Sequence, residues 1–139
     1  MEIKKPKEIL DILNKQSELL IFVLRSHLII EYFLEKIINQ KTSIKLKGKE
    51  TFYTKILVIE AINLIPEEII KAIKELNTLR NKIGHELDYE IKEKDTLRLI
   101  EYVNRFSTYK EINTSKNLQK ILIYLMGFLN GYLYKIQNN

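Results

Sequence analysis

The chain contains very few residues that interrupt helices or form tight turns. It has four glycines and two prolines in 139 residues, and these residue types most often punctuate regular structure. Long uninterrupted segments follow from that scarcity. Within them, apolar residues recur at steps of three and four, the pattern of amphipathic helices. We therefore predict an all-α fold without strands, a single domain over residues 1–139. Its expected form is an antiparallel bundle of four main helices with short extra helices.

Turn signals and periodicity place the helices along the chain. Pro66 suits the first position of a helix, because it loses no hydrogen-bond donor there. Asp95 is suited to cap the next helix, and Thr114 or Ser115 the last one. A lysine-bearing connection over residues 41–50 breaks the helical pattern. The predicted helices span residues 8–14, 17–40, 51–65, 66–84, 95–106 and 116–136.

The same periodicity predicts which residues face the core. The helix that follows Asp95 is expected to bury Leu97, Ile100, Val103 and Phe106. The last helix is apolar on several sides, which indicates a central position or contact with a second chain. Its Gly127 and Gly131 have the Gly-x-x-x-Gly spacing found where helices approach closely.

Composition excludes several kinds of site. With no cysteine there is no disulfide and no thiolate metal site, and the two histidines lie in separate segments, which argues against zinc. The first residues lack the apolar core of a signal peptide. The longest apolar run, residues 121–129, is far shorter than the roughly 20 residues of a membrane span. We predict a cytoplasmic protein with no metal, no cofactor and no membrane partner.

Residues 76–89 carry the most distinctive chemistry of the chain. Arg80 presents a forked set of donors that suits phosphate, and His85 can give or take a proton near neutral pH. Arg80 falls on the predicted apolar stripe of its helix, with Asn77 and Asn81 beside it. Gly84 is expected to end that helix or loosen its last turn. These residues predict a polar pocket rather than an arbitrary stretch of surface.

The Arg-Asn-x-x-x-His pattern of Arg80, Asn81 and His85 resembles the signature of the HEPN superfamily, all-helical domains of which many are metal-independent ribonucleases. Residues 26–34 and 52–56 are more loosely similar to the early helices of HEPN-like proteins related to mannitol-operon regulators and to phage-defence domains. HEPN toxins paired with nucleotidyltransferase antitoxins usually carry a tyrosine two residues after the histidine. Here that position is Leu87, and the nearest tyrosine is Tyr89, so pairing with such an antitoxin is in doubt.

The resemblance implies an endoribonuclease, acting as a growth-inhibiting toxin or a phage-defence effector. The ribose 2′-hydroxyl attacks its own phosphate in single-stranded or loop RNA. His85 would be the general base or acid, Arg80 would bind the phosphate and stabilise developing charge, and Asn81 would position a phosphate oxygen or Arg80. The alternative is a non-catalytic regulator or adaptor that resembles mannitol-operon repressors. Its Arg80, Asn81 and His85 would form a buried polar network or bind a regulatory protein.

Supporting residues around this motif also have two interpretations each. Glu31 and His27 are neighbours on a largely apolar helix face. Either Glu31 and His27 satisfy each other's polar groups, or Glu31 orients Arg80 or Asn81. In the second interpretation Asn77 is also a supporting residue that does not itself contact the substrate. The lysines of the 41–50 connection are either a solvated loop or an arm that contacts RNA phosphates. The candidate RNA-binding lysines are Lys45, Lys47, Lys49 and Lys82.

The spacing of Arg80 and His85 raises a geometric problem. Five residues of a regular helix turn the two side chains about 140° apart, so one helix does not readily place both on one phosphate. Either Gly84 breaks the helix or a second chain supplies the missing group. A two-fold dimer brings the same surface of both chains together. We therefore predict a homodimer that binds RNA in a shared groove, with the apolar last helix available for the contact.

Overall fold

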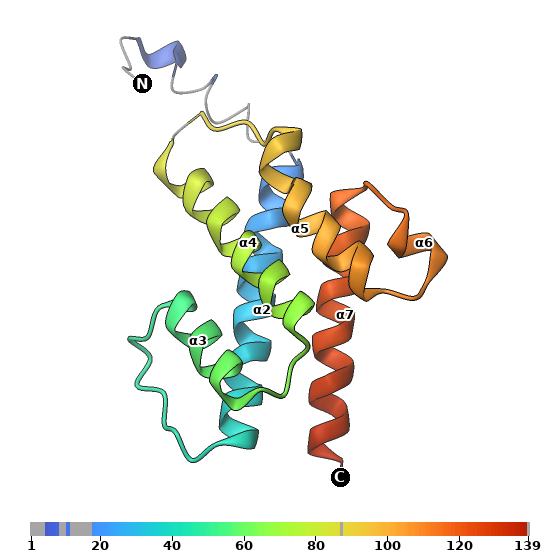
Figure 1. Ribbon diagram of the computed structural model, residues 1–139. Coiled ribbons are helices and arrows are strands. Elements are labelled where there is room, and N and C mark those ends of the chain that lie inside the picture. Colours follow the sequence, from blue (N-terminus) through green and yellow to red (C-terminus); the bar gives the residue numbers. More distant parts are fainter. Residues whose placement is uncertain (1–4, 9–10, 12–17, 87, 139) are drawn as a thin grey trace.

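The computed structural model describes residues 5–8, 11, 18–86 and 88–138. It confirms the all-α class, because these residues form helices joined by short connections and contain no strand (Figure 1). The predicted helix over residues 8–14 falls mostly outside the described residues. The helices are α2 (Glu18–Lys41), α3 (Phe52–Ile62), α4 (Glu67–His85), α5 (Glu93–Phe106), α6 (Lys110–Asn113) and α7 (Leu118–Gln137).

Two helix pairs define how the elements run past one another. α4 and α5 are antiparallel, and an ion pair joins Lys82 near the end of α4 to Asp95 near the start of α5. α2 and α7 lie side by side and run in the same direction, from top to bottom of Figure 1. Leu19 and Leu118, both at the starts of their helices, line one pocket. α3 packs against α2 and α4.

The core consists almost entirely of isoleucine and leucine from these helices. In α5 the buried residues include Leu99, Ile100 and Val103, whereas Leu97 is exposed. The prediction that Leu97 faces the core is therefore wrong. Leu99 takes that place because the buried stripe of α5 is set by its long contact with α4. Among the described residues no helix is long and apolar enough to span a membrane.

Several helix ends differ from the prediction by a few residues. Pro66 is the N-cap of α4 rather than its first residue. Asp95 lies in the first turn of α5, where its carboxylate accepts the Lys92 N–H at 2.9 Å. Asn117, and not Thr114 or Ser115, caps α7 by accepting the Lys120 N–H at 3.1 Å. The periodic pattern reaches across such ends, so it places a boundary only to within about two residues.

Candidate functional site

The helix that carries the Arg-Asn-x-x-x-His motif does not end at Gly84. α4 continues through His85, and Glu86 is its C-cap in an extended conformation. Gly84 has an ordinary helical backbone, since Asn63 and Gly48 are the positive-φ residues of the described chain. The predicted C-cap role of Gly84 is therefore wrong, and the motif lies on one continuous helix.

Gly84 instead makes room for the side chain of Arg80. A Cβ atom at position 84 would collide with the Arg80 Nη1 atom, so the guanidinium lies directly over the glycine. Gly84 is four residues beyond Arg80, about 40° around the helix, and His85 is the next residue, about 100° further. The guanidinium is therefore carried one turn along α4, to the level of His85. This reduces the angle between the two groups without breaking the helix.

The three motif side chains point to solvent. Arg80, Asn81 and His85 are all exposed, and within the described part of the chain their side chains form no hydrogen bond or ion pair. The prediction that Arg80 lies on the buried stripe is wrong, because Leu79 and Ile83 supply the buried residues of that turn. An exposed guanidinium beside an exposed imidazole can bind an anion and exchange a proton with it.

A buried histidine lies behind this surface. His27 of α2 is 6% exposed, its Nε2 is 3.4 Å from Asn77 Oδ1 of α4, and its ring centroid is 4.0 Å from that of Phe52. Burial lowers the pKa of His27, and the charges of Arg80 and Lys55 act in the same direction. The Asn77 hydrogen bond and Glu31 oppose that shift. A neutral His27 thus ties α2 to the turn of α4 that precedes Arg80, and Asn77 contacts His27 rather than a motif residue.

Glu31 makes a contact that neither sequence interpretation included. Its Oε2 accepts a hydrogen bond from Lys55 Nζ of α3 at 3.0 Å, and Lys55 Nζ also reaches Glu35 Oε1 at 2.6 Å. Lys55 is only 5% exposed, and the two carboxylates satisfy its charge. Burial is the largest single influence on the pKa of Lys55, and it lowers that pKa. The hydrogen bonds to Glu35 and Glu31 together outweigh burial, so the pKa of Lys55 is raised above the ordinary lysine value.

Sequence reasoning missed this ion cluster, which consists of Lys55, Glu31 and Glu35. The signal was present: Lys55 lies three residues after Phe52 and four before Ile59, on the face expected to be buried. A lysine there needs a carboxylate partner, and Glu31 and Glu35 are one turn apart on α2. Which helix supplied that partner was decided by the packing of α3 on α2.

Lys82 is held in a second polar cluster at the end of α4. Its Nζ is 3.2 Å from Asp95 Oδ1, and the buried Asp95 carboxylate also accepts a short hydrogen bond from the Tyr89 hydroxyl. Burial is the first cause that raises the pKa of Tyr89, to about 12, and the bond to Asp95 adds to it. These contacts anchor the connection after His85. Lys82 remains about half exposed, so it can also face a phosphate.

The other candidate RNA-binding lysines lie in the connection between α2 and α3. Lys45, Lys47 and Lys49 are exposed there, and Gly48 supplies the left-handed turn, with φ of 78°. The connection ends at Thr51, directly before Phe52, whose ring contacts His27. The structure does not bring these lysines into contact with Arg80.

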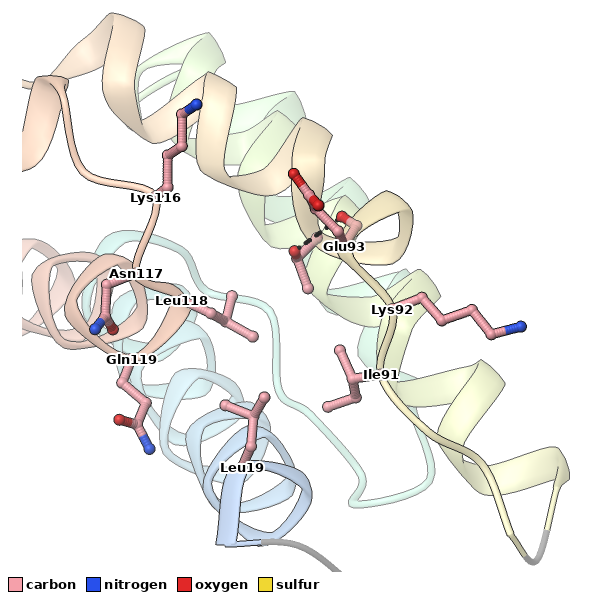
Figure 2. Close-up of a pocket in the computed structure, with 9 residues that line it drawn as sticks. Leu19, Ile91, Lys92, Glu93, Lys116, Asn117, Leu118 and Gln119 are labelled. Carbon is pink, nitrogen blue, oxygen red and sulfur yellow. Dashed lines mark hydrogen bonds between the residues drawn. The ribbon is translucent and has the colours of Figure 1, made fainter.

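A pocket of about 460 Å³ lies where the starts of α2, α5 and α7 meet, and none of the three motif residues lines it (Figure 2). Leu19, Ile91 and Leu118 point into it, whereas Lys92 and Lys116 point away. The buried Thr96 hydroxyl donates to the Glu93 carbonyl at 3.1 Å. The Thr96 hydroxyl is thus engaged within α5.

Comparison with known proteins identifies no relative: no family model, no curated protein and no solved structure matches the chain. In the described residues, no group of three or more His, Cys, Asp or Glu side chains is placed to hold a metal ion. The candidate site is therefore defined by its own geometry: Arg80 over Gly84, with Asn81 and His85 beside it.

Proposed function

We propose that this chain is a metal-independent endoribonuclease of the HEPN type, with Arg80, Asn81 and His85 as its catalytic residues. The observation that carries the proposal is the position of the Arg80 guanidinium over Gly84, one residue before His85. This cation and a proton-transfer group are both exposed on the last turns of α4 and are not engaged by the described protein. A phosphodiester needs those two groups when its own 2′-hydroxyl attacks it.

In the proposed reaction, the ribose 2′-oxygen forms a bond to phosphorus while the bond to the 5′-oxygen breaks. One imidazole accepts the proton of the 2′-hydroxyl, and a proton donor protonates the leaving oxygen. Arg80 stabilises the negative charge that gathers on the non-bridging oxygens, and Asn81 orients the phosphate. The products are a 2′,3′-cyclic phosphate and a 5′-hydroxyl. His85 supplies one of the two proton-transfer steps within a protomer.

The experiment that tests this function is cleavage of a labelled RNA in excess chelator. The expected result is cleavage with 2′,3′-cyclic phosphate ends, lowered about a hundredfold or more by His85→Ala, the usual scale for lost general acid–base catalysis. The exposed His85 side chain has no partner in the described residues, so its loss should leave the melting temperature nearly unchanged. Strict dependence on a divalent ion, or cleavage by His85→Ala at the wild-type rate, would refute the mechanism.

A homodimer completes the proposal, because the second protomer supplies the arginine or the imidazole that one helix does not readily place on the same phosphate. Contact through α7 would not achieve this. Pro66 borders the exposed side of α7 and lies 14 residues before Arg80, about 21 Å along α4. The exposed apolar residues of α2 are better placed, since Leu28, 64% exposed, directly follows His27. We place the dimer contact on this α2 surface, which consists of Ile21, Leu28, Ile29 and Tyr32.

Mixed dimers test this arrangement. Arg80→Ala and His85→Ala protein, mixed under conditions that exchange subunits, should recover part of the activity if the groups act across the interface. Leu28→Glu should produce monomers and lose cleavage. Heterodimers without activity would leave a site within each chain, and a wild-type monomer at micromolar concentration would remove the dimer from the proposal.

We propose a cellular role as a toxin or phage-defence effector, with an antitoxin or other regulatory protein as its partner. Expression of the wild-type chain should then arrest growth, and His85→Ala should relieve the arrest. The second candidate is a non-catalytic regulator or adaptor, and the paired network of His27, Asn77 and the ion cluster favours it as a rigid scaffold. Exposure of Arg80 and His85 favours the nuclease. Regulation without cleavage would be seen as specific DNA or protein binding by protein that leaves RNA intact.

A further inference from the structure

The exposed side of α7 forms a groove that the proposed nuclease site does not use. Its volume is about 590 Å³, and we call it the aromatic groove. Four aromatic side chains, two glycines and one lysine line most of it. The lining residues are Leu64, Pro66, Tyr109, Tyr124, Gly127, Phe128, Gly131, Tyr132 and Lys135. Pro66 is the N-cap of α4, so the groove lies toward the opposite end of that helix from His85.

Gly127 and Gly131 keep this groove open. Both glycines are exposed, and no atom lies within 4 Å of a Cβ added at either position. The expectation of close helix approach is therefore not met within the chain. Glycine is among the least favourable residues in a helix interior. Because no described contact requires either glycine, their effect is on the surface: a gap one helical turn long between aromatic walls.

The walls present aromatic rings whose polar ends are available. Tyr109 is 67% exposed and meets Tyr124 edge to face, with ring centroids 6.4 Å apart. Phe128 is held in a similar contact with Phe106, at 5.1 Å. In the described structure, the hydroxyls of Tyr109, Tyr124 and Tyr132 have no hydrogen-bond partner. The groove thus offers flat faces for stacking and hydroxyls for hydrogen bonding.

Charge favours an anionic occupant. The groove lining includes Lys135 and no acidic residue, and α7 contains no aspartate or glutamate along its whole length. Lys110 directly follows Tyr109, and Lys120 lies two turns of α7 before Gly127. Aromatic faces interleaved with lysines are the combination that binds single-stranded nucleic acid, whose bases stack while its phosphates pair with cations.

We propose that the aromatic groove binds single-stranded RNA as a second contact for the substrate of the nuclease site, an inference that rests on the proposed function. Bases stack on Tyr109 and Tyr132, and Lys135 pairs with a phosphate. Because Pro66 and Arg80 are about 21 Å apart along α4, the groove holds nucleotides several positions away from the one that is cleaved. The substrate class is therefore an extended single strand rather than a dinucleotide.

Binding is measured with full-length His85→Ala protein, which does not consume the probe, and a fluorescein-labelled oligouridylate of about 12 nucleotides, within the range of single-strand sites. Tyr109→Ala removes a stacking ring, and Gly131→Leu fills the gap. Each is expected to weaken binding about tenfold, the scale of one lost base–aromatic contact. Lys135→Gln should reduce the slope of log affinity against log salt by about 0.7.

Tyr134→Ala is the matched control, since Tyr134 is 68% exposed on the same helix and does not line the groove. It should bind RNA like the parent protein. Unchanged RNA affinity in both Tyr109→Ala and Gly131→Leu would overturn the proposal and leave the groove to a peptide partner. An equal loss in Tyr134→Ala would overturn it too, because the effect would not belong to the groove. Circular dichroism confirms that each variant is helical.

The outcomes separate this proposal from the nuclease itself. If the chain is a nuclease but the aromatic groove does not bind RNA, the wild-type protein and Tyr109→Ala should cleave long RNA at the same rate. If both stand, Tyr109→Ala raises KM for long RNA, leaves kcat unchanged, and has no effect on a dinucleotide. If wild-type protein cleaves nothing while the groove variants still lose binding, RNA binding stands alone and the catalytic proposal fails.

Discussion

Gly84→Ala should stabilise this protein and inactivate it. Alanine is a better helix former than glycine by about 1 kcal/mol in a helix interior, and somewhat less in the last turn, where position 84 lies. The backbone there has no positive φ, so alanine fits it. We expect a gain of about 0.5 kcal/mol, or about 2 °C in melting temperature for a domain of this size.

The new methyl group occupies the place of the Arg80 guanidinium, which must move. That movement is easy for the fold, because the clash involves only the end of a flexible side chain. It is costly for catalysis, since a displacement of about 1 Å in a positioned group can lower the rate about a hundredfold. The assays are thermal unfolding and kcat/KM for RNA cleavage, expected to move in opposite directions.

Two controls isolate the cause. Gly127→Ala is the same substitution in the interior of α7, where no atom lies within 4 Å of the added Cβ, so it should stabilise the protein by somewhat more, about 1 kcal/mol. Adding Gly84→Ala to Arg80→Ala should lower cleavage no further, because both changes act through one guanidinium. Wild-type cleavage by Gly84→Ala would refute the reasoning, as would an equal further loss in the double variant.

Three other predictions concern the polar groups behind the site. Lys55→Met leaves Glu31 and Glu35 without their cation, and because these carboxylates are 26% and 41% exposed, it should lower the unfolding free energy by about 1.5 kcal/mol in chemical denaturation. Lys71→Met, which breaks the exposed pair with Glu67, should change it by less than about 0.5 kcal/mol; equal effects would contradict the buried cluster. Because burial lowers the pKa of His27 below 6.5, the unfolded state binds its proton first, so stability should fall as pH drops below about 6.5, and His27→Gln should remove that part of the pH dependence. Tyr89→Phe removes a donor to the buried Asp95 carboxylate and should lower stability by about 1–3 kcal/mol, while Tyr134→Phe on the surface should have no measurable effect.

The helical class and most helix positions could be predicted from the sequence because they depend on local spacing. A strip of apolar residues at three- and four-residue steps buries itself on whatever neighbour is present, so α2, α3 and α7 were predicted within about three residues of their bounds. The same local reasoning identified Arg80, Asn81 and His85 as unusual. It also assigned Gly84 to a helix end, because glycine most often has that role.

Tertiary structure decided the partners of the polar residues. Lys55 and Glu31 are 24 positions apart in the sequence, and His27 and Asn77 are 50 apart, so no periodicity within one helix could pair them. The exposure of Arg80 also depended on packing, because Leu79 and Ile83 meet the core and leave the arginine outside. The sequence by itself therefore determined that the chain is helical, and it singled out the residues proposed to be catalytic. Only the packing of α2, α3 and α4 determined which charges are buried and paired and which face solvent, because burial depends on the neighbouring helices.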